Sequence, residues 1–172
     1  MDRSENQVNQ VYLSIGSNLG NKKKNLEFAK YLLISYGINV LSTSSFYQTK
    51  SWPNEKFPDF FNILLLANTR LTLIELFKKI KFIEQLIGRT AAPKNYPRIC
   101  DIDIVDYNNK CSNTIYLNKK IIVPHKSLHN RNFVLLPLYE INKKWIHPKF
   151  KKNIVKLISS LPTNELRSIK LV

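Results

Sequence analysis

Two aspartates separated by one residue are the first feature of this sequence that could do chemistry. Asp101 and Asp103 lie in residues 99–107, an apolar and β-branched run that predicts a strand. Side chains two apart in a strand share a face, so these carboxylates project together. Neighbouring carboxylates repel each other, but they suit Mg²⁺, which takes few carboxylates and fills its other positions with water and phosphate oxygens. The alternative is a solvated strand face, and the pair alone leaves both interpretations open.

Cationic side chains flank these aspartates and could donate hydrogen bonds to phosphate oxygens. Arg89 and Arg98 bracket a polar loop that precedes them. The spacing of His125 and His129 would also suit zinc on one helix face, but no third ligand is evident, so phosphate binding is favoured. The cluster that follows the aspartates consists of Lys119, Lys120, His125, Lys126, His129 and Arg131.

A third pattern pairs an aromatic residue with an amide. Phe60 and Asn62 lie two apart in residues 60–67, a predicted strand, and therefore share a face. A flat heterocycle could stack on the ring and hydrogen-bond to the amide, which both donates and accepts. Taken alone, the pair favours a core aromatic residue beside a polar residue at a strand end, since aromatic strand residues usually pack.

The elements that must position these residues alternate between strand and helix. Turn residues follow the first strand, Asn21 can cap the helix after it, and Gly37 can end that helix. A capping box of Thr72 and Glu75 starts a second helix, which Gly88 ends. The predicted strands are residues 11–15, 40–47, 60–67 and 99–107, with a short extended piece at 121–123 and further helices within 135–141 and 151–161.

This order predicts an α+β fold with an antiparallel or mixed sheet covered by helices. With 172 residues and 44% apolar content, the chain is long enough for one domain with its own core. No repeat or linker divides it, so we expect a flexible tail over residues 1–8 and a single domain over residues 9–172.

Composition limits the partners and the compartment. The net charge of +15 favours phosphorylated or polyanionic partners, although lysines spread over solvated faces would give the same value. Two cysteines are too few for a disulfide framework, and no apolar run is long enough to span a membrane or to act as a secretory signal. We therefore expect a cytoplasmic protein. The sequence lacks the Gly-x-x-x-x-Gly-Lys-Ser/Thr phosphate loop of common kinases, and it has only four glycines.

Read in order, seven segments of the chain resemble one family, the 6-hydroxymethyl-7,8-dihydropterin pyrophosphokinases. The resemblance extends from about Val11 to His147 and Pro148, nearly the whole chain. An ordered series is far more specific than any one motif. The segments are IGSNLG at residues 15–20, SSFYQT at 44–49, PDFFN at 58–62, IE through GR at 83–89, PR at 97–98, DIDI at 101–104, and VPH through NRNF at 123–133.

The resemblance implies a ferredoxin-like α/β/α sandwich with a mixed, mainly antiparallel sheet. It also implies an ATP- and Mg-dependent diphosphotransferase, a pyrophosphokinase of folate biosynthesis. Such an enzyme transfers diphosphate from ATP to 6-hydroxymethyl-7,8-dihydropterin and releases AMP. Two Mg²⁺ ions and a monomeric enzyme are expected, with neither nucleic acid nor a membrane as partner.

The same resemblance implies roles for residues at matching positions. Asp101 and Asp103 would bind both metal ions, and together with Arg89 and Arg98 they form the expected catalytic set. ATP would be bound by Glu84, Arg98, Ile104, Lys120, His125 and Arg131. Phe60 and Phe133 would sandwich the pterin ring, and the pterin-binding set is Thr49, Trp52, Phe60, Asn62 and Phe133.

The chain departs from the family pattern mainly between Arg89 and Arg98. The family commonly has a Trp-Gly-Pro-Arg run there, whereas this chain has Asn95, Tyr96, Pro97 and Arg98, so the resemblance suggests Tyr96 as the replacement for a lid tryptophan. The rival from another class is a basic, ferredoxin-like nucleic-acid-binding module without catalysis. That module would need glycine-containing aromatic motifs that are not seen, and it leaves the two aspartates unexplained.

Overall fold

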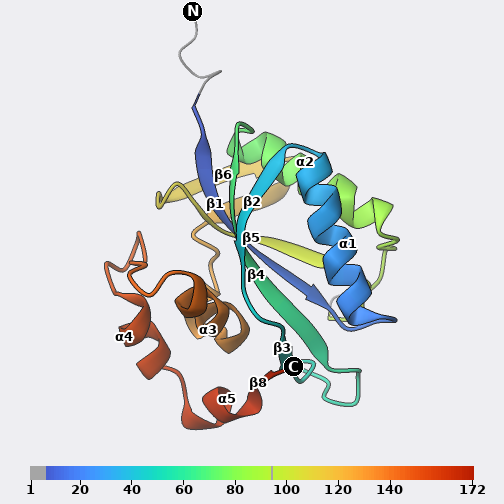
Figure 1. Cartoon of the computed structure of the whole chain (residues 1–172), viewed down its shortest axis with the longest axis vertical. Helices are drawn as coiled ribbons and strands as arrows, with labels where there is room; N and C mark the ends of the chain where they lie inside the picture. Colours follow the sequence, from blue (N-terminus) through green and yellow to red (C-terminus); the bar gives the residue numbers. More distant parts are fainter. Residues whose placement is uncertain (1–6, 94) are drawn as a thin grey trace, which may run out of the picture.

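A computed structural model describes residues 7–93 and 95–172 and shows one sheet with helices on both faces (Figure 1). In chain order the elements are β1 (Asn9–Ser17), α1 (Lys22–Ser35), β2 (Ile38–Thr43), β3 (Tyr47–Thr49), β4 (Phe60–Thr69), α2 (Leu73–Leu86), β5 (Asp101–Tyr107), β6 (Ser112–Tyr116), β7 (Lys119–Val123), the 3₁₀ helix η1 (Leu128–Asn130), α3 (Asn132–Ile141), α4 (Ile154–Ser159), α5 (Thr163–Ser168) and β8 (Lys170–Leu171).

The strand order is β5-β1-β4, and β2 and β3 pair in turn with the remaining edge of β4. All strand pairings among the described residues are antiparallel. β8 adds to β3, while β6 and β7 form a separate hairpin. The order agrees with the predicted ferredoxin-like α+β fold and its mainly antiparallel sheet. Within the described residues, no helix is long and apolar enough to cross a membrane.

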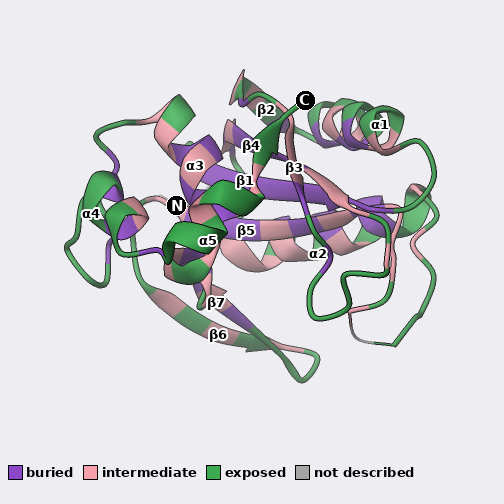
Figure 2. Ribbon diagram, turned by 90° about the horizontal axis from the view of Figure 1, so that it is seen from below, coloured by how far each residue is buried: buried purple, intermediate pink, exposed green. Residues whose placement is uncertain are grey.

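Alternation along β1 divides the interior into two cores. Val11, Leu13 and Ile15 point to the face covered by α1 and α2, where one buried cluster forms. Tyr12 points to the other face, where a second cluster gathers residues of α3 and α4. Figure 2 shows β1 and β5 as buried strands between these layers. The sheet is therefore covered by apolar side chains on both faces, which is the expected α/β/α sandwich.

Helix ends follow the capping chemistry of the sequence. Asn21 accepts a hydrogen bond from the backbone of Lys24, and Thr72 and Glu75 form the predicted capping box. Gly37 and Gly88, which follow α1 and α2, have φ angles of 83° and 101°, and this left-handed conformation favours glycine. The predictions for both helices are confirmed.

The structure differs from the sequence predictions in four short elements. The strand predicted over residues 40–47 is divided into β2 and β3 at Ser44, where the backbone N–H of Leu64 donates to the Ser44 hydroxyl instead of a backbone carbonyl. The hairpin strand β6 and the elements α5 and β8 were not predicted. The tail predicted over residues 1–8 falls mostly on residues 1–6, which lie outside the described residues.

A β-bulge in β5 shapes the region that follows the aspartates. The register between β1 and β5 shifts between Tyr12 and Leu13, so Val105 has no partner on β1. The carbonyl oxygen of Val105 accepts a hydrogen bond from the backbone of His125 at 2.9 Å. The bulge therefore anchors the chain after β7 next to the strand that carries Asp101 and Asp103.

A buried histidine predicts a pH dependence of stability. Burial, and secondarily the charge of His129, lowers the pKa of His147 to about 4, while an unfolded histidine has a pKa of about 6.5. The unfolded chain therefore binds the extra proton between these values, and stability should fall as the pH falls through this window. The Nδ1 atom of His147 accepts hydrogen bonds from the backbone N–H groups of Lys149 and Phe150. The side-chain oxygen of an asparagine at this position could accept the same bonds.

We expect the wild-type protein to lose more unfolding free energy than His147→Asn when the pH is lowered from 7 to 5. Urea unfolding followed by circular dichroism at both pH values measures this difference. Equal losses in the two proteins would show that another group carries the dependence.

Candidate active site

A cleft of about 1190 Å³ opens where one face of the sheet is left uncovered by α3 and α4. Its floor is formed by the ends of β1, β4 and β5, with Gly16 of the central strand paired to Asn62 on one side and to Asp101 on the other. Its walls come from residues 50–55, residues 89–93 and 95–98, the start of α3, and α5. Side chains far apart in sequence thus meet in one cleft.

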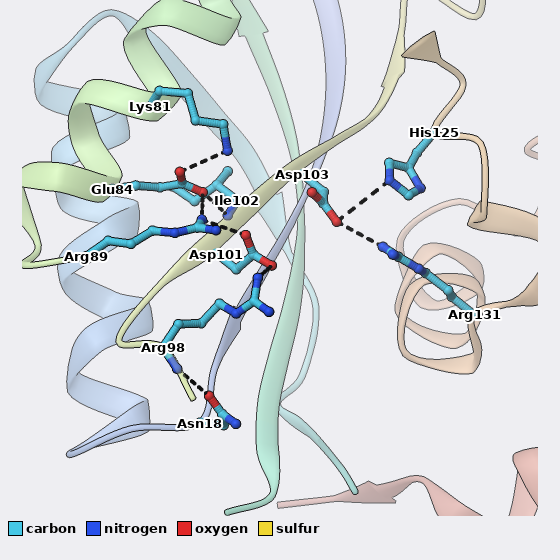
Figure 3. A network of polar contacts seen from close by, with 10 residues as sticks. All are labelled: Asn18, Lys81, Glu84, Arg89, Arg98, Asp101, Ile102, Asp103, His125 and Arg131. Carbon is cyan, nitrogen blue, oxygen red and sulfur yellow. Dashed lines mark hydrogen bonds and ion pairs between the residues drawn. The ribbon is translucent and has the colours of Figure 1, made fainter. Parts of the chain in front are cut away.

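Asp101 is held between two arginines on the cleft floor (Figure 3). The Nη1 atom of Arg89 lies 2.6 Å from Oδ1 of Asp101, and Nη1 of Arg98 lies 2.9 Å from Oδ2. Burial raises the pKa of Asp101, but the attraction of Arg89 and Arg98 outweighs it and holds that pKa below its usual range. The carboxylate is therefore ionised and fixed in orientation.

Asp103 points into the same cleft from the same strand face and is paired differently. Its Oδ2 atom accepts a hydrogen bond from Arg131 at 2.9 Å and lies 4.0 Å from Nε2 of His125. Burial lowers the pKa of His125, with Asp103 opposing this effect, so the imidazole is disposed to be neutral near pH 7. The two aspartates therefore have different cationic partners: Asp101 pairs with Arg89 and Arg98, and Asp103 pairs with Arg131.

Glu84 of α2 supports Arg89 from beneath. Its side chain is buried and accepts hydrogen bonds from Arg89, from Lys81 at 2.8 Å and from the backbone of Ile102 at 2.8 Å. Burial raises the pKa of Glu84, and the two cations counteract that rise. Because the same guanidinium reaches both Glu84 and Asp101, α2 and β5 fix its position together.

Asn18, in the turn after β1, joins three segments of the site. Its Oδ1 accepts a hydrogen bond from the backbone of Arg98 at 2.7 Å, and its Nδ2 donates to Ser51 at 3.0 Å and to the carbonyl of Pro58 at 3.3 Å. The side chain is 1% exposed, so these bonds are shielded from water. Asn18 thereby ties Arg98 to the loop that carries Trp52.

The opposite part of the cleft offers aromatic and amide groups. Phe60 and Asn62 line it from β4, and Nδ2 of Asn62 donates to Oγ1 of Thr49 at 3.0 Å. Phe133 lines it from the start of α3, with the guanidinium of Arg131 at 5.4 Å from its ring centre. A flat ring with polar edges would fit these groups, since one surface stacks and the other hydrogen-bonds.

The structure brings most of the residues predicted from sequence to this cleft, but not all of them. Glu84 lies buried beneath Arg89, and Ile104 belongs to the core cluster under α1 and α2. Lys120 lies exposed on β7, away from the cleft walls. The predicted residues that line the cleft are Thr49, Trp52, Phe60, Asn62, Arg89, Arg98, Asp101, Asp103, His125, Arg131 and Phe133.

Several residues of the site were missed at the level of sequence. In the sequence, Asn18 is recognisable only as part of the turn after the first strand. Gly16 lies opposite Asn62 and Asp101, and this depends on the register of β1 with β4 and β5, which the sequence does not reveal. Asn164, Glu165 and Ser168 of α5 line the cleft, but their short polar segment gave no signal. His129, considered with His125, packs against Phe150 with 5.1 Å between ring centres.

Tyr96 connects two of the cleft walls. Its ring lies against Phe57 with centroids 5.4 Å apart, and both residues stand on loops that border the opening. Tyr96 itself lines the cleft. The role of Tyr96 as a replacement for the lid tryptophan stays a prediction.

The oxygen donors of the site fit Mg²⁺. Asp101 and Asp103 both reach the cleft, and no three His, Cys, Asp or Glu side chains converge anywhere in residues 7–93 and 95–172. Two carboxylates with space beside them suit a hard cation that takes its remaining ligands from water and phosphate. A closed site of nitrogen and sulfur ligands is not formed by the described residues.

The fold and this arrangement define an α+β protein with a cleft that bears paired carboxylates and cationic side chains. Residues 12–143 match the family described as 7,8-dihydro-6-hydroxymethylpterin-pyrophosphokinase. The chain belongs to this family, which confirms the resemblance inferred from its motifs.

Named proteins that are similar in sequence to this chain include one of similar length and one much longer. A 2-amino-4-hydroxy-6-hydroxymethyldihydropteridine pyrophosphokinase of Aquifex aeolicus is 37% identical, over 83% of this chain and 86% of the relative. The folic acid synthesis protein fol1 of Pneumocystis carinii is 32% identical over 97% of this chain, which spans only 22% of that longer protein.

Solved structures agree at the level of the fold. The crystal structure of an HPPK-DHPS in complex with substrates superposes with a TM-score of 0.74 and 19% identity, covering 90% of this chain and 43% of the other. A mutant Plasmodium falciparum HPPK-DHPS with pterin and p-hydroxybenzoate gives a TM-score of 0.79 at 15% identity, over 98% of this chain and 48% of the other.

Gly16 provides a test of the cleft floor. A Cβ atom at this position would lie 3.0 Å from Oδ1 of Asn62 and 3.4 Å from the ring of Phe60, so Gly16→Ala must displace the amide or the ring. We expect a loss of stability of about 1–3 kcal/mol, as for other overpacked sites. Urea unfolding measures it, and an unchanged midpoint would show that both side chains move aside at no cost.

Proposed function

We propose that this protein transfers the terminal diphosphate of ATP to the hydroxymethyl group of reduced 6-hydroxymethylpterin, giving the pterin diphosphate and AMP. One observation carries the proposal: the carboxylates of Asp101 and Asp103 and their paired cations share a single cleft with the aromatic and amide groups of Phe60, Asn62 and Phe133. Family membership supports the same reaction and a place in folate biosynthesis.

Asp101 and Asp103 would hold two Mg²⁺ ions. When bound, these ions would neutralise charge on the phosphate oxygens and lower the pKa of the attacking hydroxyl. The carboxylates are suited to this because both are open to the cleft and lie two residues apart on one strand face. No side chain need act as a dedicated base.

The cationic side chains would bind and orient the triphosphate. Arg89, Arg98 and Arg131 already point at the floor through their carboxylate partners, so their positions are fixed before ATP arrives. Fixed donors stabilise the charge that develops during in-line attack without reorganisation. His125 would add a hydrogen-bond donor on the side of Asp103.

The pterin would lie between Phe60 and Phe133, with its polar edge toward Asn62 and Thr49. Trp52, with 79% of its surface exposed, stands on the loop beside this place. The aromatic surfaces would exclude water from the ring, and the amide would select for hydrogen-bonding groups on its edge.

A single chain supplies every group named here, which supports action as a monomer. The free thiols of Cys100 and Cys111 support a reducing, cytoplasmic setting.

The nucleic-acid-binding alternative gains no support. The family match concerns a pyrophosphokinase, and a polyanion lying over the cleft would meet the carboxylates of Asp101 and Asp103. The charge of +15 remains a feature without an assigned role.

The reaction predicts a strong effect of one carboxylate. Purified protein with ATP, Mg²⁺ and reduced hydroxymethylpterin should form AMP only when the pterin is present. Asp103→Asn keeps the shape of the side chain but loses the charge that would hold the metal. We expect kcat to fall by about two to four orders of magnitude, because stabilisation of phosphate charge by a metal is worth several kcal/mol.

Glu27→Gln is the control for a loss of negative charge, since Glu27 lies on α1 outside the cleft and, among the described residues, forms its ion pair with Lys30. This variant should retain wild-type turnover. AMP measured by chromatography in a quenched reaction gives kcat for each protein. Normal turnover by Asp103→Asn would remove Asp103 from the metal site, and absence of pterin-dependent AMP in the wild type would overturn the proposed activity.

A further inference from the structure

The segment after α4 forms a wall of the cleft that lies outside the part of the chain matched to the family, which ends at residue 143. Asn164, Glu165 and Ser168 of α5 line the cleft together with Phe133. Figure 1 shows this red C-terminal segment passing from α5 to β8 and ending beside β3. The segment therefore touches both sides of the place where a flat ring would lie.

Asn132 connects α5 to the aromatic residue that follows it. Its Nδ2 donates to the carbonyl oxygen of Glu165 at 2.6 Å and to Oγ of Ser168 at 3.1 Å, with the Glu165 carboxylate at 3.4 Å. Its Oδ1 accepts a hydrogen bond from the backbone of Phe133 at 2.6 Å. Asn132 is 4% exposed, so its amide is largely shielded from water although its partners Glu165 and Ser168 lie at the surface.

The other end of the segment is fixed to the sheet. β8 pairs with β3, with Lys170 opposite Gln48 and Leu171 opposite Tyr47, and the backbone of Val172 donates to Phe46 at 3.1 Å. β3 also carries Thr49, which accepts the hydrogen bond of Asn62. One continuous piece of chain thus joins the backbone of Phe133 to the strand beside Phe60 and Asn62.

We propose that Asn132 and residues 163–172 are positioning elements for the pterin, setting the separation of Phe133 from Phe60, and that they leave ATP binding unaffected. The inference rests on the function proposed above. Its physical basis is that a stacked ring needs a fixed spacing between its two walls. Phe133 stands at the first turn of α3, where its backbone donates to the Asn132 side chain, and that side chain donates in turn to α5.

Binding measurements separate this role from catalysis. We would titrate each protein with reduced 6-hydroxymethylpterin in the presence of Mg²⁺ and a non-hydrolysable ATP analogue, and separately with the analogue alone. Asn132→Ala removes the bonds on both sides of the amide, so pterin affinity should fall about tenfold or more. Ser168→Ala removes one acceptor, and a fall of about threefold is expected. Affinity for the analogue should stay within about twofold of wild type in both.

Ser159→Ala is the matched control for Ser168→Ala. Oγ of Ser159 donates to the carbonyl of Lys156 at 3.1 Å, just as Oγ of Ser168 donates to that of Glu165 at 2.9 Å, but Ser159 is on α4 and does not line the cleft. It should bind pterin as the wild type does. Circular dichroism and urea unfolding would show that each variant is folded.

Wild-type pterin affinity in both folded cleft variants would overturn the inference, as would an equal loss of affinity for pterin and the ATP analogue. Failure of the proposed function has a different signature, because there the wild type makes no pterin-dependent AMP. A wild type that binds no pterin would overturn both.

Discussion

The pairing of β1 with two neighbours at once is the constraint on which the cleft depends. In one register Gly16 lies opposite Asn62, and in the other it lies opposite Asp101. The missing side chain leaves space that Asn62 and the ring of Phe60 occupy from one side. A shift by one residue on either edge would turn the amide or the carboxylate into the apolar core. The two chemically different halves of the cleft are therefore joined through a single backbone position.

The same sheet explains why polar groups can gather here. Further along this face Tyr12, Leu64 and Val105 are covered by α3 and α4, whereas Asp101 and Asp103 lie beyond that cover. The carboxylates avoid the cost of full burial because they remain open to the cleft and have arginine partners. Glu84, which is buried, is satisfied by two cations and a backbone amide. The network fixes cations without leaving a buried charge unpaired.

The features predicted correctly from the sequence are those that depend on interactions between residues close together in the chain. Alternation placed Asp101 and Asp103 on one face, and the caps at Asn21 and Thr72 fixed both long helices. The sequence is less informative where tertiary contacts determine the position of a residue. Lys120 is close to His125 in sequence, but the β6–β7 hairpin holds it on an exposed strand, and α5 is too short and polar to be recognised without the partners that stabilise it. Nothing in the sequence around Asn18 indicates its bond to Arg98, 80 residues away.

The ion pairs of the cleft and its aromatic walls differ in how they would contribute to substrate affinity. Arg89, Arg98 and Arg131 neutralise carboxylates that would otherwise repel one another across the floor. In the proposed reaction a metal-bound triphosphate would offer phosphate oxygens to the arginines and metal ions to the aspartates, so each side chain would exchange one oppositely charged partner for another. This exchange would leave neither set unpaired and would need little movement of the backbone. The aromatic half of the cleft has no such exchange, since its ring surfaces gain contacts only when a planar ligand enters. Ion pairs thus order the half of the site that carries Asp101 and Asp103. In the proposed function, the spacing of Phe60 and Phe133 orders the other half.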